Sequence, residues 1–196
     1  MMKLEKKYNC IITGVGGQGT VLLSRLICGA ATEKGFAVGG SETIGMAQRG
    51  GSVVSHVRIG ERVLSPLVPY GKADVIIALE PAEAVRVLPY LGKDGEMFVL
   101  DRAVQPAGCE LRGGRAYATF DMTSYLKENV EKLTVVNYQR LVGILGGAKA
   151  VNTAMLGAAV KKGVFPFCIQ DVEKIIRERL PEKFWAVNTE ALTCSV

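Results

Sequence analysis

Three glycines near the N-terminus have the spacing of a phosphate-binding loop. The segment GVGGQG places them in the pattern G-x-G-x-x-G, between the apolar residues 10–12 and the apolar residues 21–23. Between a strand and a helix, the first glycine permits a tight turn and the second lets the backbone approach a pyrophosphate. The helix that follows offers N–H groups and a partial positive charge to an anion. The candidate ligand contacts in this loop are Gly14, Gly16, Gly17, Gln18 and Gly19.

A nicotinamide dinucleotide site needs a residue that is missing here. Such sites hold the ribose hydroxyls with an Asp or Glu at the end of the second strand. The predicted second strand, residues 36–38, runs into the sequence GGS, and Glu42 follows later, in a predicted loop. NAD is therefore disfavoured. Two interpretations of the glycines stay open: contact with a phosphate or another anion, or a tight turn that packs helix on strand and binds nothing.

A second segment, GGSETIGMAQRGG at residues 39–51, combines glycines with polar side chains. Its arginine lies between a glutamine and two glycines. Arginine binds carboxylates and phosphates through a bidentate fork, so this segment could hold an anionic ligand. A solvated arginine in a surface loop is the alternative. The candidates in this segment are Ser41, Glu42, Gln48, Arg49 and Gly50.

The elements that must position both loops alternate between strand and helix. Residues 8–13 predict a first strand, and residues 18–34 predict a helix that is apolar on most sides. The runs DVIIAL (74–79) and EMFVLD (96–101) are short, apolar and bounded by charge, which is typical of central parallel strands buried on both faces. Both loops would then lie at the carboxyl ends of neighbouring strands, where ligands bind in such sheets.

The rest of the chain completes this pattern. Residues 53–59 alternate as a strand does, and Arg62 to Ser65 are predicted to pair back as a hairpin. Most of the chain beyond residue 138 is predicted to be helical. We therefore predict an α/β, Rossmann-like layered fold with a largely parallel central sheet and a helical C-terminal segment, in a single domain over residues 1–196.

Composition narrows the function classes. The net charge is +5, but the 24 Lys and Arg residues are scattered, which argues against nucleic-acid binding. The five cysteines have no CxxC spacing, so neither a zinc site nor an iron–sulfur site is predicted. No apolar stretch reaches the ~20 residues of a membrane span, and no signal peptide is recognisable, so we expect a cytoplasmic protein.

His56, the only histidine, is expected to be structural, and Asn152 is expected to cap a helix. No catalytic or metal-binding residue is predicted.

Several stretches in order resemble one family. GVGGQG, SETIGMAQRGGSVVSHVRIG, ADVIIALEPAEAVRVLPYL, AVNTAMLGAAV and NTEAL are similar to the gamma-type domain of the 2-oxoacid:ferredoxin oxidoreductases. Within that family the chain looks like the small (beta) subunit of the indolepyruvate type. The likeness covers nearly the whole chain.

The resemblance implies a subunit of a cytoplasmic, multi-subunit enzyme that is inactive alone. Such complexes decarboxylate a 2-oxoacid (here indolepyruvate or another aryl pyruvate) on thiamine diphosphate, pass electrons through 4Fe–4S clusters to ferredoxin, and capture the acyl group on coenzyme A. The resemblance also implies that the thiamine and cluster sites belong to the large (alpha) subunit. This chain has no thiamine motif that would contradict this division, since Lys93-Asp94-Gly95 has the wrong neighbours for one. This chain would pack on that subunit and help form the substrate or coenzyme A site.

Three alternatives remain at this point. The chain could be a gamma subunit that serves pyruvate, 2-oxoisovalerate or 2-oxoglutarate, or a free-standing module that binds a nucleotide or coenzyme A. It could also be a free-standing nicotinamide dehydrogenase, which the missing strand-end acid disfavours.

Overall fold

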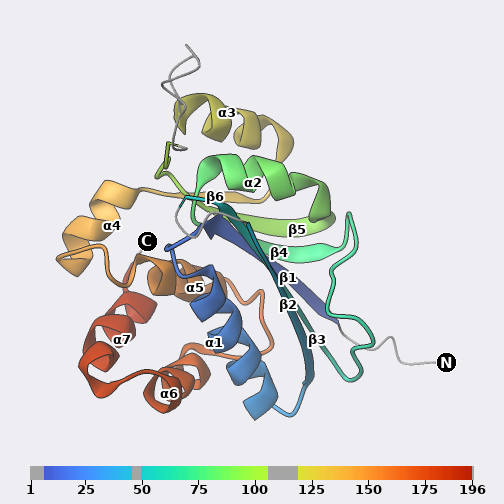
Figure 1. Ribbon diagram of the computed structural model, residues 1–196, viewed down its shortest axis with the longest axis vertical. Helices are drawn as coiled ribbons and strands as arrows, with labels where there is room; N and C mark the ends of the chain where they lie inside the picture. The colour runs from blue at the N-terminus through green and yellow to red at the C-terminus, as the bar shows by residue number, and fades with distance from the viewer. Residues whose placement is uncertain (1–6, 46–49, 106–118, 196) are drawn as a thin grey trace.

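The structure, a computed structural model, describes residues 7–45, 50–105 and 119–195. Its strands form one six-stranded sheet in the order β2-β3-β1-β4-β5-β6 (Figure 1). The strands are β1 (Tyr8–Val15), β2 (Ala37–Ile44), β3 (Ser52–Gly60), β4 (Ala73–Ala78), β5 (Leu91–Leu100) and β6 (Leu133–Val136). Neighbours β1, β4, β5 and β6 pair in parallel, whereas β3 runs antiparallel to β1 and to β2. The predicted α/β fold with a largely parallel sheet is confirmed.

Helices cover the two faces of this sheet. They are α1 (Thr20–Glu33), α2 (Pro81–Val87), α3 (Thr119–Asn129), α4 (Tyr138–Leu145), α5 (Val151–Lys161), α6 (Ile169–Arg179) and α7 (Trp185–Thr193), with short 3-10 turns at Leu88–Tyr90 and Glu182–Phe184. Figure 1 shows α2 and α3 on one side of the sheet, and α1, α5, α6 and α7 on the other. Each side has its own buried cluster of apolar side chains. The predicted helical C-terminal segment is therefore confirmed.

The central strands are apolar for a physical reason. Val75, Ile76 and Ile77 of β4 are fully buried, because consecutive side chains point to opposite faces and helices cover both faces there.

In the part of the chain that the structure describes, no helix combines the length and the apolar composition needed to span a membrane.

Two predicted loops are different in the structure. Residues 39–44 were predicted as loop, but they continue β2, where Ser41 lies opposite His56 and Glu42 opposite Ser55. The partner strand β3 supplies hydrogen bonds that outweigh the low strand propensity of this polar segment. The predicted hairpin at residues 62–65 is wrong: the described residues 61–72 contain no strand and instead cross the face of the sheet between β3 and β4.

The expectation that the two glycine-rich loops follow neighbouring strands needs one correction. β3 lies between β1 and β2 and runs against both. Because β2 is antiparallel to β3, it points the same way as β1, and the ends of β1 and β2 still share the carboxyl edge of the sheet.

Candidate functional site

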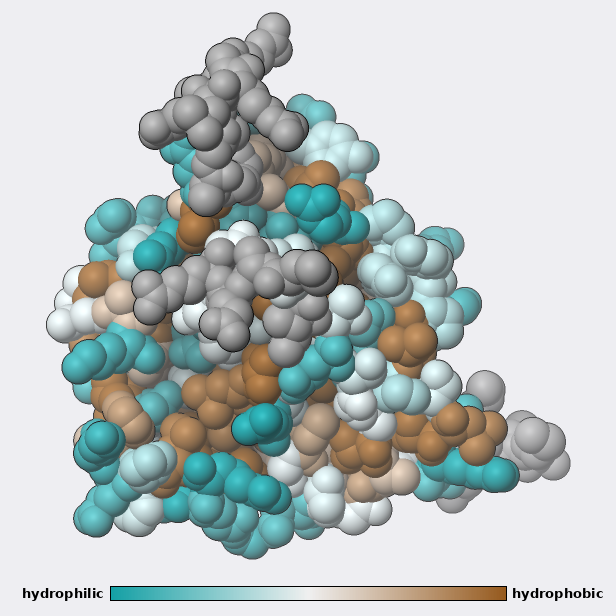
Figure 2. Space-filling view, viewed as in Figure 1, coloured by the Kyte–Doolittle hydropathy of each residue, from teal (hydrophilic) through white to brown (hydrophobic). Residues whose placement is uncertain are grey.

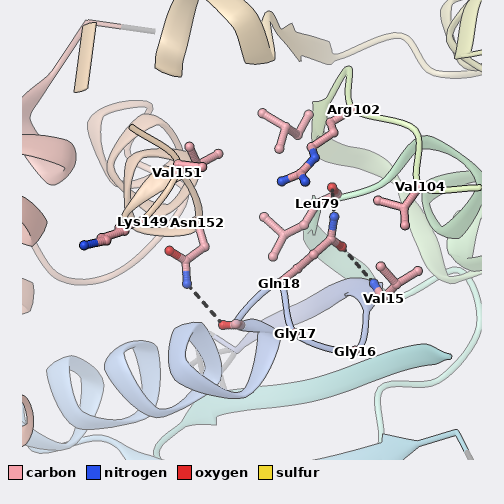
Figure 3. A pocket seen from close by; sticks show the side chains of 13 residues that line it. Val15, Gly16, Gly17, Gln18, Leu79, Arg102, Val104, Lys149, Val151 and Asn152 are labelled. Atoms are coloured by element: carbon pink, nitrogen blue, oxygen red, sulfur yellow. Dashed lines mark hydrogen bonds between the residues drawn. The ribbon is translucent and has the colours of Figure 1, made fainter. Parts of the chain in front are cut away.

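A pocket of about 560 Å³ opens at the carboxyl edge of the sheet, above the glycine loop (Figure 3). Four separate segments of the chain meet there, namely the glycine loop between β1 and α1, the ends of β4 and β5, and the start of α5. The lining residues are Val15, Gly16, Gly17, Gln18, Gly19, Leu79, Leu100, Arg102, Val104, Ala148, Lys149, Val151 and Asn152. This is the place where open α/β sheets hold ligands.

The Gln18 side chain holds the glycine loop in shape. Its Oε1 accepts the N–H of Val15 at 2.8 Å, and its Nε2 donates to the carbonyl oxygen of Leu79 at 2.9 Å. A Cβ on Gly14 would lie 2.6 Å from the same Oε1, so glycine is required for Gln18 to fold back under the loop. Gln18 was predicted as a ligand contact. Both ends of its amide are used within the protein, so it positions the loop.

Glycine is required at two further positions of this loop. Gly17 and Gly19 have φ angles of 97° and 86°, which other residues adopt only with strain. A Cβ on Gly19 would also fall against the side-chain amide of Asn152, whereas the space around Gly17 is open. Gly16 donates its N–H to the carbonyl oxygen of Gly51 at 2.8 Å, so this N–H is not available to a ligand.

The first turns of two helices converge on the pocket. Gly19 is the N-cap of α1 and Ala150 is the N-cap of α5, and neither helix has a side-chain cap or an acidic residue in its first turn. The N–H of Thr153 in α5 donates to Asn152 Oδ1 at 2.9 Å, and the remaining first-turn N–H groups and the partial positive charge at such ends favour an anion. Asn152, in the first turn of α5, donates through Nδ2 to the carbonyl oxygen of Gly19 at 3.5 Å and so ties the two helix starts together (Figure 3).

Two cations complete the positive character of the pocket. Figure 3 shows the Arg102 guanidinium pointing over the open space above the glycine loop, whereas the Lys149 ammonium points outward at the rim. Arg102 also stacks on the ring of Tyr138, with 4.6 Å between the guanidinium carbon and the ring centroid. The lining residues include no Asp, Glu, His or Cys. The described residues that line the pocket therefore suit an anionic group, and none of them carries a side chain for proton transfer at neutral pH.

Two buried carboxylates hold the segments on either side of the glycine loop. Glu80, fully buried, is the N-cap of α2, and its Oε1 also accepts the N–H of Val104 at 3.3 Å. Glu83 accepts the hydroxyl of Ser52 at 2.5 Å, directly after the segment that bonds to Gly16. One end of α2 thus fixes both the Arg102–Val104 wall and the start of β3.

The structure separates the residues predicted from the second glycine-rich segment. Ser41 and Glu42 lie on β2, and the Glu42 carboxylate accepts the hydroxyl of Ser24 in α1 at 2.9 Å. Neither residue lines the pocket. Gly50 is exposed beside Gly51, with a φ of 73°. Gln48 and Arg49 lie outside the described residues.

The placement of Glu42 bears on NAD binding. A dinucleotide fold has its acidic residue on the strand next to the glycine loop. Here β3 separates β2 from β1, so Glu42 is two strand spacings, roughly 10 Å, from β1. The acid on β2 therefore does not lie beside the glycine loop, and Glu80, which follows the neighbouring strand β4, already accepts the N–H groups of Glu83 and Val104.

Sequence reasoning missed Arg102 and Lys149, and it named Asn152 only as a helix cap. Arg102 lies two residues after the end of β5, so its place after a central strand was an available indication. Asn152 was expected to cap α5: the N-cap position is Ala150, but Asn152 Oδ1 accepts the N–H of Thr153 in the first turn at 2.9 Å, while its Nδ2 contacts the glycine loop. No local pattern brings residues 149–152 to residue 19, because this contact spans 133 positions.

His56 is buried away from the pocket. Its Nδ1 accepts the N–H of Val68 at 3.2 Å, and its ring meets the ring of Tyr90 edge to face, with 5.3 Å between centroids. Burial lowers its pKa below 6.5. These contacts agree with the expected structural role.

The described residues offer no ligand set for a metal ion or an iron–sulfur cluster. Among them, no group of three or more His, Cys, Asp or Glu residues is arranged to hold a metal. Cys10, on β1, is buried in the core. Burial raises the pKa of the Cys28 thiol to about 11, opposite to what a thiolate ligand needs.

Comparisons with known proteins agree on one family. A family model described as pyruvate ferredoxin/flavodoxin oxidoreductase matches residues 9–196. Indolepyruvate oxidoreductase subunit IorB of Thermococcus kodakarensis is 37% identical over 193 residues, which cover 97% of this chain and 95% of that protein. The pyruvate/ketoisovalerate oxidoreductases common subunit gamma of Pyrococcus abyssi is 27% identical over 180 residues, covering 91% and 89%.

Solved structures share the fold. Pyruvate oxidoreductase subunit PORC of Thermotoga maritima superimposes with a TM-score of 0.66 at 20% identity, covering 96% of this chain and 94% of that one. The 2-oxoglutarate:ferredoxin oxidoreductase of Magnetococcus marinus matches with a TM-score of 0.68 at 16% identity. That match covers 95% of this chain but 30% of the other, so there the fold is one part of a longer chain.

Proposed function

Because this chain belongs to the pyruvate ferredoxin/flavodoxin oxidoreductase family, we propose that it is the small subunit of an indolepyruvate oxidoreductase. The observation that carries the proposal is the 37% identity to an IorB subunit over nearly the full length of both chains. The alternative, a common gamma subunit for pyruvate and ketoisovalerate, has the weaker support of 27% identity. We take residues 1–196 as a single domain of a cytoplasmic enzyme.

In this proposal the chain binds and positions coenzyme A, and its partner, the large subunit, performs the redox chemistry. In the part of the chain that the structure describes, the pocket lining has cations and helix N-termini but no Asp, Glu, His or Cys. Thiamine diphosphate and 4Fe–4S clusters, which supply decarboxylation and electron transfer to ferredoxin, are assigned to the large subunit. The described residues of this chain do not provide cluster ligands.

The pocket is proposed to hold a phosphate-bearing part of coenzyme A, the acyl acceptor. Arg102 and the first turns of α1 and α5 favour a phosphate, and Lys149 adds a cation at the rim. Gly17 leaves open space beside the loop, so a ligand can approach the backbone there. Glu80 and Gln18 contribute by fixing the walls of the pocket.

Reconstitution tests the proposal. This chain and the large subunit from the same organism are purified separately without oxygen, and reduction of ferredoxin is followed with indolepyruvate and coenzyme A. We expect activity only when both chains are present, and a higher kcat/KM for indolepyruvate than for pyruvate or 2-oxoisovalerate. Activity of this chain alone, or a preference for pyruvate, would contradict the proposal.

A further inference from the structure

The cation that points over the pocket has an aromatic partner from another segment of the chain. Arg102 lies two residues after the end of β5, and Tyr138 lies two residues after the end of β6. These strands pair in parallel with Leu100 opposite Val136, so the positions just beyond them lie side by side at the carboxyl edge of the sheet. The guanidinium carbon of Arg102 is 4.6 Å from the centroid of the Tyr138 ring, within the range of about 6 Å for a cation–π contact. Strand pairing therefore gives Arg102 this partner.

The Tyr138 ring is held by the residue that precedes Arg102. Asp101 Oδ1 accepts the N–H of Tyr138 at 2.5 Å, and its Oδ2 accepts Nδ2 of Asn137, the N-cap of α4, at 2.9 Å. The Asp101 N–H donates to the carbonyl oxygen of Val136 at 3.0 Å. The Tyr138 ring also packs against the buried apolar cluster on the α5 side of the sheet. Because the first turn of α4 uses both carboxylate oxygens of Asp101, the ring has a fixed place beside Arg102.

The guanidinium of Arg102 keeps its hydrogen-bond donors for a ligand. Within the part of the chain that the structure describes, it has no ion-pair or hydrogen-bond partner. A contact with the face of a ring uses none of its N–H donors, whereas an ion pair would use some of them and neutralise the charge. Figure 3 shows the guanidinium directed over the glycine loop. The ring therefore restricts Arg102 without competing with an anion.

This restriction favours binding, by a modest factor. An arginine side chain that is already restricted loses less rotamer freedom when it binds a phosphate. Arg102 is exposed, and Figure 2 shows teal, hydrophilic atoms among the apolar ones at the left of the molecule, where α4 lies. Water therefore reaches the contact, and solvated cation–π contacts are weaker than desolvated ones.

We propose that Tyr138 is a positioning residue of the pocket: the face of its ring holds Arg102 where the guanidinium binds a phosphate of coenzyme A. The inference rests on the proposed function, which assigns this pocket to coenzyme A. Tyr138 is not among the residues that line the pocket, so it acts through Arg102. Only the ring face has this role, so phenylalanine should replace Tyr138 and leucine should not.

The test measures binding of coenzyme A by titration calorimetry, with the full chain alone and in complex with the large subunit. The KM and kcat of the complex are measured in parallel by ferredoxin reduction. Tyr138→Leu keeps an apolar side chain against the core but lacks the ring. We expect it to raise the Kd and the KM for coenzyme A about three- to fivefold, with kcat nearly unchanged. Tyr138→Phe should keep the wild-type values.

Two further variants separate positioning from a general effect. Tyr125→Leu on α3 is the matched control, because Tyr125 is another exposed tyrosine and does not line the pocket. In the background of Arg102→Ala, Tyr138→Leu should change the Kd by less than about 1.5-fold, since the group that it positions is gone. Thermal unfolding verifies that each variant is folded. Tyr138→Met, also without a ring, replaces Tyr138→Leu if the leucine variant does not fold.

The possible results lead to different conclusions. If Tyr138→Leu binds coenzyme A as wild type does, the positioning role is wrong while the proposed function stands. The same holds if Tyr138→Phe binds as weakly as Tyr138→Leu, or if Tyr138→Leu keeps its full effect in Arg102→Ala. If wild type binds no coenzyme A, alone or in complex, the pocket assignment and the positioning role are both wrong. A preference for pyruvate over indolepyruvate contradicts only the proposed subunit, because the calorimetry reports coenzyme A binding without either substrate.

Discussion

Gly16 and Gly51 are joined by a backbone hydrogen bond of 2.8 Å, although they belong to two segments that the sequence marks separately. The bond fixes the glycine loop to the start of β3. It also uses one N–H of the loop, so ligand contacts must come from the remaining loop backbone and from the side chains around the pocket.

The contact between Gly19 and Asn152 leads to a stability prediction. Gly19→Ala should lower the free energy of unfolding by roughly 2–4 kcal/mol, because a positive φ and the Asn152 side chain both oppose a Cβ. Gly17 also has a positive φ, but the space around it is open, so Gly17→Ala should lower the free energy of unfolding by about 1–2 kcal/mol. Urea unfolding measures both. Equal losses would show that the Asn152 contact adds nothing.

Removing the Gln18 amide should loosen the bridge between β1 and β4. Gln18→Ala leaves the N–H of Val15 and the carbonyl oxygen of Leu79 without this partner, and we expect a loss of about 1–3 kcal/mol in the free energy of unfolding. Gln170→Ala, on the exposed side of α6, serves as the control and should change stability by less than about 0.5 kcal/mol. Similar values for the two variants would contradict the bridging role.

Arg102 should contribute more to ligand binding than Lys149. In the assembled enzyme, Arg102→Ala is expected to raise the KM for coenzyme A about tenfold with little change in kcat, because it removes uniform binding of a phosphate. Lys149→Ala should have a smaller effect, since its ammonium points outward. Lys127→Ala on α3 is the control for a general loss of positive charge. An unchanged KM for coenzyme A in Arg102→Ala would show that this pocket does not bind coenzyme A.

His56 makes stability depend on pH. Burial lowers its pKa in the folded state below 6.5, so the unfolded chain binds the proton first as pH falls. Above about pH 6.5 His56 is neutral in both states and does not lower the free energy of unfolding. The free energy of unfolding then decreases as pH falls from about 6.5 toward the lowered pKa. His56→Gln keeps an acceptor for the N–H of Val68 but does not titrate. Unfolding of both proteins at pH 7.5 and 5.5 checks this, and an equal loss for both would contradict it.

The sequence by itself determined the strand, glycine loop and helix at residues 8–34, the buried central strands and the helical C-terminal segment. These features follow from local periodicity and from the backbone freedom of glycine, both of which neighbouring residues specify. The tertiary structure alone decided that β3 enters between β1 and β2 and moves Glu42 away from the glycine loop. It also decided that Arg102 and Asn152 line the pocket. Such placements depend on strand pairing and on packing between segments more than a hundred residues apart, which no local spacing encodes.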